Sequence, residues 1–260
     1  MHKSMMDMYD LTGKTAIVTG GSQGLGESFA RGLAKAGCNL VLTARTLSKL
    51  EKVAAEMAHY GVEALAVQAD VNKREDLEAM LKQALDRFGK IDVLVNNAGI
   101  SAVNEAEDMT DEEFQSVIKT NIGGVFLCSQ VVGRQMLKQG HGKIINIASM
   151  YSFVGASYVP QVSYTTSKAG VLGMTREMAV EWAPKGVQVM ALAPGFFRSD
   201  QTIWAFEQNK ELGEKLLARV PMGRMGRLEE LEGTIVYLAS DASGYMAGQT
   251  LALDGGFLSW

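Results

Sequence analysis

The chain reads Thr19-Gly20-Gly21-Ser22-Gln23-Gly24-Leu25-Gly26 directly after an apolar segment, KTAIVT at 14–19, and before a helical pattern that ends near Gly37. Glycines let the backbone turn tightly and approach a pyrophosphate, and a helix N-terminus presents free N–H groups with a positive dipole. The spacing is GxxxGxG, whereas the usual dinucleotide-binding fingerprint is GxGxxG. A plain glycine turn stays an alternative, but the position after the first strand favours phosphate binding.

Outward from this turn, short apolar segments alternate with longer helical patterns along the whole chain. Apolar segments without strict alternation are typical of parallel strands that helices cover on both faces. The succession predicts an α/β fold, Rossmann-like, with a doubly wound parallel seven-stranded sheet. The expected strands are 14–19, 39–44, 64–68, 92–97, 143–149, 187–193 and 250–254, and the expected helices are about 25–37, 47–60, 73–88, 111–138, 163–183 and 228–240.

Local signals refine this organisation. Thr110 with Glu113 makes a capping box at a helix start, and Asn72 with Glu75 makes a similar pair. The irregular stretch at about 194–227 is longer than an ordinary connection, so we expect it to carry short helices or to form a lid over a site. No repeat or linker interrupts residues 1–260, which are expected to form one domain.

Composition limits the class of partner. The formal net charge is −4 and neither sign of charge forms a long run, so we expect neither nucleic acid nor an anionic membrane as a partner. The start has no signal-peptide core and no long apolar stretch follows, which favours a cytoplasmic protein. Cys38, Cys128 and the three histidines lack metal-ligand spacing, so no metal is expected. A small-molecule substrate is the default.

The second expected strand ends in Leu42-Thr43-Ala44-Arg45, where a dinucleotide-binding fold contacts the adenosine ribose. An acidic residue at this point would bind the 2′-hydroxyl, whereas an arginine suits a 2′-phosphate. Arg45 therefore favours NADP(H) as the cofactor, with NAD(H) as the alternative. A solvated surface arginine is the other interpretation.

Polar residues follow the third and fourth expected strands, as Asp70-Val71 and Asn96-Asn97-Ala98-Gly99. Ligands of open parallel sheets bind outside the carboxyl ends of the strands, which makes both segments candidates. Ordinary turn chemistry explains either segment equally well, because Asp and Asn often satisfy backbone groups in turns.

Tyr164 and Lys168 lie four residues apart on the helix after the fifth expected strand, so they share one helix face. A free tyrosine titrates near 10, and a nearby ammonium favours its phenolate form. Such a pair also arises often by chance, so the spacing alone decides little. Ser149, at the end of the fifth strand, could hydrogen-bond a substrate oxygen.

Taken together, these segments resemble the short-chain dehydrogenase/reductase family in its single-domain form. The resemblance extends over nearly the whole chain, and the motifs stand in the family's order. They are TGGSQGLG at 19–26, DV at 70–71, NNAG at 96–99, Asn121 in KTNIGG, Ser149 in NIAS, YTTSK at 164–168, PG at 194–195 and LDGG at 253–256.

The resemblance implies an NAD(P)(H)-dependent oxidoreductase that interconverts a ketone and a secondary alcohol. Tyr164 would exchange the proton with the carbonyl or hydroxyl oxygen, and Lys168 would hold the nicotinamide ribose and lower the pKa of Tyr164. Ser149 would orient the substrate oxygen, and Asn121 would help anchor a water that links Lys168 to solvent. This division of labour is general acid–base catalysis on a cofactor that supplies the hydride.

The resemblance also implies a cofactor-binding set. Ser199 stands where the family commonly has threonine, which keeps the hydroxyl near the nicotinamide amide. Gln23 stands where many NADP-preferring members have Arg or Lys, which leaves Arg45 as the main phosphate ligand. The expected set is Gly20, Ser22, Gln23, Gly24, Leu25, Gly26, Arg45, Asp70, Val71, Asn97, Ala98, Gly99, Tyr164, Lys168, Pro194, Gly195, Phe197 and Ser199.

The substrate is less well determined. The loop between Ser149 and Tyr164 is longer by two residues than in most members, which should reshape the pocket. GKIINIASMYSF and the C-terminal LASDASGYMAGQTLALDGG resemble sugar-acid or polyol dehydrogenases and ketone reductases. Aromatic and apolar residues would equally suit a small or cyclic ketone, unless they pack a core or an interface; they are Met150, Tyr151, Phe153, Phe196, Phe197, Trp204 and Phe206.

Two further functions stay open as alternatives. A 3-oxoacyl thioester reductase differs only in its substrate. A non-catalytic nucleotide-binding sensor would keep the fold, but it is disfavoured because the serine, tyrosine and lysine are all present. The resemblance implies a homotetramer, formed through the helices at about 111–138 and 163–183 and the C-terminal segment, and the apolar end GFLSW with Trp260 agrees with a buried terminus.

Overall fold

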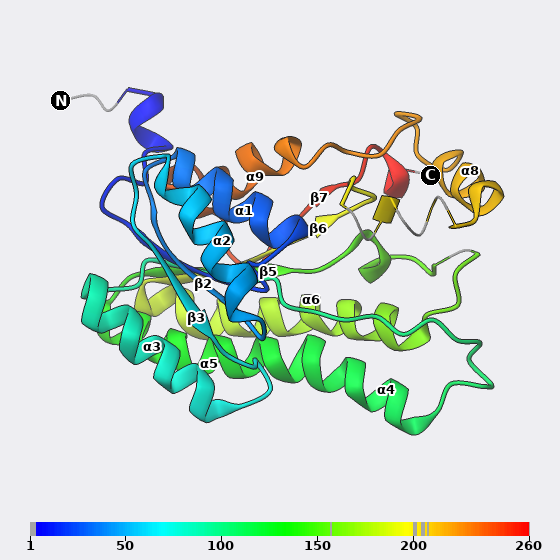
Figure 1. The fold of residues 1–260 in the computed structure, drawn as a ribbon, viewed down its shortest axis with the longest axis horizontal. Helices are drawn as coiled ribbons and strands as arrows, with labels where there is room; N and C mark the ends of the chain where they lie inside the picture. The colour runs from blue at the N-terminus through cyan, green and yellow to red at the C-terminus, as the bar shows by residue number, and fades with distance from the viewer. Residues whose placement is uncertain (1–3, 157, 200–201, 204–205, 207, 260) are drawn as a thin grey trace.

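A computed structural model describes residues 4–156, 158–199, 202–203, 206 and 208–259 (Figure 1). Trp204 and Trp260, which the sequence singles out, lie outside these described residues. The predicted doubly wound parallel sheet is confirmed, with its strands in the order β3-β2-β1-β4-β5-β6-β7. The strands are β1 Thr15–Thr19, β2 Asn39–Ala44, β3 Ala64–Gln68, β4 Val93–Asn96, β5 Gly142–Ile147, β6 Val187–Pro194 and β7 Thr250–Leu253.

Helices cover the sheet on both faces (Figure 1). On one face Ala16 and Val18 of β1 join a core with α1, α2 and α9, and on the other face Ile17 joins a core with α3, α5 and α6. Both cores need apolar strand residues, which explains the continuous apolar segments of the sequence. The helices are α1 Gly24–Lys35, α2 Leu47–Ala58, α3 Arg74–Phe88, α4 Asp111–Ile118, α5 Val125–Gln139, α6 Val162–Trp182, α8 Lys210–Leu217 and α9 Glu229–Ala239.

The helix expected at 111–138 is not uniform. A π-helical segment, Lys119–Gly124, joins α4 to α5. Gly124 allows close packing here, because a Cβ on it would lie 2.8 Å from the Val71 side chain. π-Helical segments occur often at functional sites, and this one contains Asn121.

Of the two capping pairs expected from the sequence, one is correct. Thr110 and Glu113 form a reciprocal capping box at the start of α4. The Asn72 pair is wrong, because α3 begins after Lys73 and has no side-chain cap. The Asn72 side chain instead donates to Asp70 Oδ1 and to Thr120 Oγ1, so a tertiary contact takes the place of the local cap.

The long connection after β6 contains α8, in agreement with the expected short helix. Near its start, Phe197 forms a β-bridge with Gly226. A Cβ on Gly226 would lie 2.4 Å from the Phe197 ring, so the two segments pack closely. None of the helices in the described part of the chain is long and apolar enough to cross a membrane.

Candidate active site

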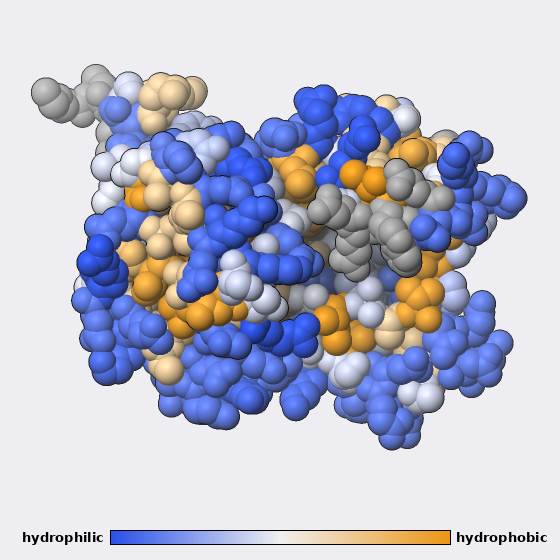
Figure 2. Space-filling view, in the orientation of Figure 1, coloured by the Kyte–Doolittle hydropathy of each residue, from blue (hydrophilic) through white to orange (hydrophobic). Residues whose placement is uncertain are grey.

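A cavity of about 1020 Å³ opens at the carboxyl ends of the strands. Figure 2 shows this face of the molecule hollowed beside α8, with apolar residues around the hollow. Every residue of the expected catalytic and cofactor-binding sets lines the cavity except Asn121. Segments from β1, β2, β4, β5, α6 and β6 therefore meet at one place.

The glycine turn is locked to the end of β4. Asn97 Nδ2 donates to the carbonyl oxygens of Thr19 (3.0 Å) and Gly20 (3.2 Å), and Thr19 Oγ1 accepts from the Asn97 and Ala98 amides. A Cβ on Gly26 would lie 2.2 Å from the Gly20 oxygen. Gly20 has a φ of 66°, in the left-handed region. The turn therefore requires these glycines for its shape.

The start of α1 is suited to an anion. Its N-cap residue, Gln23, is extended and makes no side-chain cap, so no side chain of the described chain caps the first helical amides. A helix dipole and uncapped amides at a glycine turn form a phosphate site. This cradle fits the pyrophosphate of a dinucleotide.

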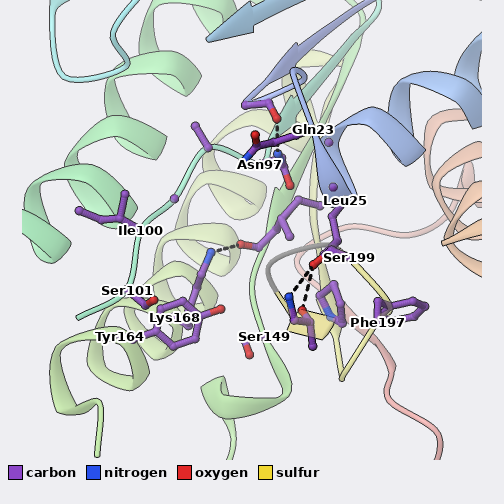
Figure 3. A pocket seen from close by; sticks show the side chains of 18 of the residues that line it. Gln23, Leu25, Asn97, Ile100, Ser101, Ser149, Tyr164, Lys168, Phe197 and Ser199 are labelled. Atoms are coloured by element: carbon purple, nitrogen blue, oxygen red, sulfur yellow. Dashed lines mark hydrogen bonds between the residues drawn. The ribbon is translucent and has the colours of Figure 1, made fainter. Parts of the chain in front are cut away.

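The side chains expected to be catalytic, Ser149, Tyr164 and Lys168, lie where β5 ends beside α6 (Figure 3). Lys168 Nζ donates to the Ile147 carbonyl oxygen over 2.7 Å and lies 5.7 Å from the centre of the Tyr164 ring. Ser149 hydrogen-bonds the Tyr164 hydroxyl. In Figure 3 Tyr164, Lys168 and Ser149 lie at one end of the cavity, and Gln23 and Asn97 at the other.

The chain is similar to known proteins over most of its length. The family model of short chain dehydrogenases matches residues 14–210. A 2-dehydro-3-deoxy-D-gluconate 5-dehydrogenase of Dickeya dadantii is 42% identical over 98% of this chain and 99% of its own. A 3-oxoacyl-[acyl-carrier-protein] reductase of Staphylococcus aureus is 41% identical over 94% of this chain and 97% of its own.

This chain belongs to the short-chain dehydrogenase family. A crystal structure of a gluconate 5-dehydrogenase from Burkholderia cenocepacia, in complex with NADP and tartrate, has a TM-score of 0.92 and 35% identity, covering 99% of this chain and 100% of that one. The predicted resemblance and the oxidoreductase class are confirmed.

Burial dominates the titration of the catalytic pair in this short-chain dehydrogenase. It raises the pKa of Tyr164, and the Ser149 hydrogen bond lowers that pKa by less. Burial also lowers the pKa of Lys168 to about 8. The lowered tyrosine pKa expected from the Lys168 ammonium is therefore wrong for the protein alone, because desolvation disfavours both charged forms.

Asn121 is buried and its side chain is engaged by protein groups. Its Oδ1 accepts from the Ile100 amide, and its Nδ2 donates to the Ile100 carbonyl oxygen and to Ser167 Oγ, each over 2.9 Å. These bonds tie the segment after β4 to α6. The water-anchoring role that the resemblance implies for Asn121 stays a prediction.

Ser152 was not found from the sequence. Its hydroxyl donates to the Lys168 carbonyl oxygen over 2.8 Å and accepts from the Ser149 amide over 3.2 Å. It thus connects the turn that carries Ser149 to the helix that carries Tyr164 and Lys168. The sequence held a signal for this link, because Ser149 and Ser152 have the three-residue spacing of a capping box.

Lys49 is the other residue that sequence reasoning missed. Like Arg45 it lines the cavity, and its Nζ donates to Gln23 Oε1 over 3.0 Å. We call this part of the cavity, where the adenosine ribose is expected to bind, the adenosine end. Arg45 is exposed and no described residue forms an ion pair with it. The sequence held a signal for Lys49, because it is a second cation four residues after Arg45 and near the start of a predicted helix.

Three of the expected site residues, Asp70, Ser199 and Gly195, also make contacts within the protein. Asp70 Oδ1 accepts from the Asn72 amide, which is the turn chemistry that the sequence left open. Ser199 Oγ bonds Thr202 Oγ1 over 2.9 Å. Gly195 lies against Asp254, whose Cα would be 2.7 Å from a Cβ at this position.

Aromatic side chains form the wall at the substrate end. Tyr151 packs edge-on against Phe196 and Phe257, and Phe196 packs edge-on against Phe206. Phe153 does not belong to this wall, because its side chain is 47% exposed and lies outside the cavity lining. For this residue the alternative of packing at an interface stays a prediction.

Proposed function

We propose that this dehydrogenase interconverts a small ketone and its secondary alcohol with NADP(H), and that Tyr164 is the acid–base group. The supporting observation is the placement of Ser149, Tyr164 and Lys168 at one end of a cavity whose other end suits a dinucleotide. The cofactor, when bound, supplies or accepts the hydride. The protein supplies the proton and the orientation.

In the direction of reduction, Tyr164 gives its hydroxyl proton to the ketone oxygen as that oxygen gains negative charge. Burial raises the pKa of Tyr164, so its phenol is protonated at neutral pH and holds the proton that this step requires. Ser149 shares a hydrogen bond with the same hydroxyl, so it can also donate to the substrate oxygen. In the direction of oxidation, Tyr164 takes the alcohol proton after it has lost its own.

Lys168 serves this step through its charge and its position. Its Nζ is anchored on the Ile147 carbonyl oxygen beside the Tyr164 ring. From there the remaining N–H groups can hold the hydroxyls of a bound ribose. Its lowered pKa of about 8 means that the ammonium is lost at mildly alkaline pH when no ligand compensates for burial.

The preference for NADP(H) rests on the adenosine end. Arg45 and Lys49 present two cations there, and Gln23 receives a hydrogen bond from Lys49 instead of adding a charge. A charge-assisted hydrogen bond contributes on the order of 1.5–3 kcal/mol, so one cation gives a preference of roughly 10- to 150-fold for the phosphorylated cofactor. The NADP complex of the Burkholderia cenocepacia relative agrees with this choice.

The cofactor preference is tested by measuring kcat/KM with NADPH and NADH for the wild type and for Arg45→Asp. We expect the wild type to prefer NADPH and the variant to prefer NADH, since the change removes a cation and adds a repelling carboxylate. Lys52→Asp is the matched control, because Lys52 is an exposed cation on α2, the helix that follows Arg45, and lies outside the cavity lining. A wild type that uses NADH equally well refutes the preference.

The reaction itself is tested by incubating the purified protein with NADPH and a panel of ketones and following cofactor absorbance. We expect cofactor oxidation that depends on the ketone, with the secondary alcohol as the isolated product. Absence of turnover with every ketone and with both cofactors would contradict the proposed function.

We also propose that the protein is a cytoplasmic homotetramer that does not bind nucleic acid. Family resemblance supports the assembly, and exposed apolar residues on the helices expected at the interface agree with it. Phe126 of α5 is 43% exposed and Val180 of α6 is 74% exposed. Sedimentation at micromolar concentration tests this, and a monomer there contradicts it.

A further inference from the structure

Among the described residues, Lys168 is the one positively charged side chain at the substrate end of the cavity, where it lies beside Tyr164. The rest of the described lining of this end comprises Ser101, Ser149, Met150, Tyr151, Val159, Gln161, Tyr164, Phe196, Phe206, Leu212 and Leu216. None of these is Lys, Arg or His. Cations line the cavity only at the adenosine end, apart from Lys168, among the residues that the structure describes.

The cations in and near this end are held by protein groups or lie outside the cavity lining. Lys168 is bonded to the Ile147 carbonyl oxygen. Arg219 stacks on the buried Phe257 ring, 4.6 Å from its centre, and is not among the residues that line the cavity. Arg198 lines a second cavity, not this one. A carboxylate beside the reacting carbonyl would therefore lose water without gaining a counter-ion, which is costly.

The same end offers good partners for an uncharged body. Phe196 packs edge-on against both Tyr151 and Phe206, with ring centres 6.2 and 5.4 Å apart, and the three rings present an apolar wall. Gln161 also lines the cavity, three residues before Tyr164, and its side-chain amide makes no hydrogen bond to any described residue. It can bind one further carbonyl or hydroxyl group of a substrate.

We propose, resting on the proposed function, that the substrate end selects an uncharged ketone with a ring-sized apolar body and discriminates against ketones that carry a carboxylate. This separates the protein from the sugar-acid dehydrogenases that it resembles in sequence. The discrimination comes from an unpaired charge, since the available volume alone would accept either substrate.

The test compares two ketones of one shape, methyl 4-oxocyclohexanecarboxylate and the free 4-oxocyclohexanecarboxylate, with NADPH absorbance as the readout. We expect kcat/KM for the acid to be at least about 100-fold lower than for the ester, because a charged group is left unpaired in the site. Equal or better use of the acid overturns this inference and leaves the proposed function intact. No turnover of either compound, or of any other ketone, overturns the proposed function.

A variant sharpens the result. Ser101 is exposed and lines the substrate end, so Ser101→Arg can place a cation there without displacing a core side chain. We expect it to narrow the gap between acid and ester by about tenfold, the effect of one charge-assisted hydrogen bond. Ser101→Gln adds length without charge and should leave the gap unchanged. Narrowing by both variants alike would show that length, and not charge, controls the selection.

Discussion

The two ends of the cavity are built differently. The cofactor end consists of backbone turns fixed by hydrogen bonds between β1 and β4, where Asn97 and Thr19 hold the glycine turn and Gly26 leaves no space for a Cβ. The substrate end consists of side chains, where Phe196, in the connection after β6, packs against Tyr151 of η3 (Met150–Ser152) and against Phe206. Backbone geometry therefore sets cofactor binding, whereas substrate choice rests on side chains that can change independently.

Tyr164→Phe, at the junction of the two ends, should have the largest effect. It removes the transferable proton and keeps the ring that lies beside Lys168, so kcat should fall at least about 100-fold while the cofactor Kd stays nearly unchanged. Steady-state kinetics and cofactor titration measure the two effects. Tyr60→Phe, on a 41% exposed side chain away from the cavity, is the control. Near-normal turnover by Tyr164→Phe would contradict the mechanism.

Lys168→Met should impair both rate and cofactor affinity but stabilise the cofactor-free protein at neutral pH. The pKa of Lys168 falls from its usual 10.5 to about 8 on folding, so the unfolded chain binds more protons between these values. Burying the Lys168 ammonium therefore lowers the free energy of unfolding by about 3 kcal/mol below pH 8. This loss disappears as pH rises toward 10.5.

Denaturant unfolding across this pH range tests the Lys168 prediction. The wild type should gain stability as pH rises from 8 to 10.5, relative to Lys168→Met, until the two differ little. A difference in stability that does not vary with pH would show that the lysine keeps its charge in the fold. A variant that binds cofactor normally would contradict the ribose-binding role.

Gly26→Ala should damage the cofactor end alone. The added Cβ meets backbone at 2.2 Å, and such overpacking costs about 1–3 kcal/mol in stability, with a parallel loss of cofactor affinity. Gly233→Ala is the control, because Gly233 lies in α9 with no atom within 4 Å of an added Cβ, and the change should stabilise by up to about 1 kcal/mol. Thermal unfolding and cofactor titration distinguish them, and equal behaviour would refute the tight turn.

Ser152→Ala should give the smallest effect and should act on the rate. Without its hydroxyl the Ser149 turn loses its link to Lys168. Two hydrogen bonds are lost, each contributing about 0.5–1.5 kcal/mol to stability, and if the equivalent of one of them reaches the transition state, kcat falls about 2- to 12-fold. We expect the cofactor KM to stay constant, the pH profile of kcat to shift with the Ser149–Tyr164 contact, and Ser152→Thr to restore activity. Ser116→Ala, on an exposed helix, is the control; an unchanged kcat would refute the link.

The amino-acid sequence by itself indicated the seven strands, because strands covered by helices on both faces are apolar at most positions. It also determined the glycine turn and the Thr110 cap, since each depends on groups only a few residues apart. The motifs for Ser149, Tyr164 and Lys168 were legible for the same reason.

Only the tertiary structure decided how these groups behave. The Asn72 side chain donates to Thr120, 48 residues away, and does not cap α3. The Asn121 side chain forms hydrogen bonds with Ile100 and Ser167. The upward shift of the Tyr164 pKa follows from burial by segments far apart in the chain. Burial and partner choice depend on long-range packing, which no local pattern of residues contains.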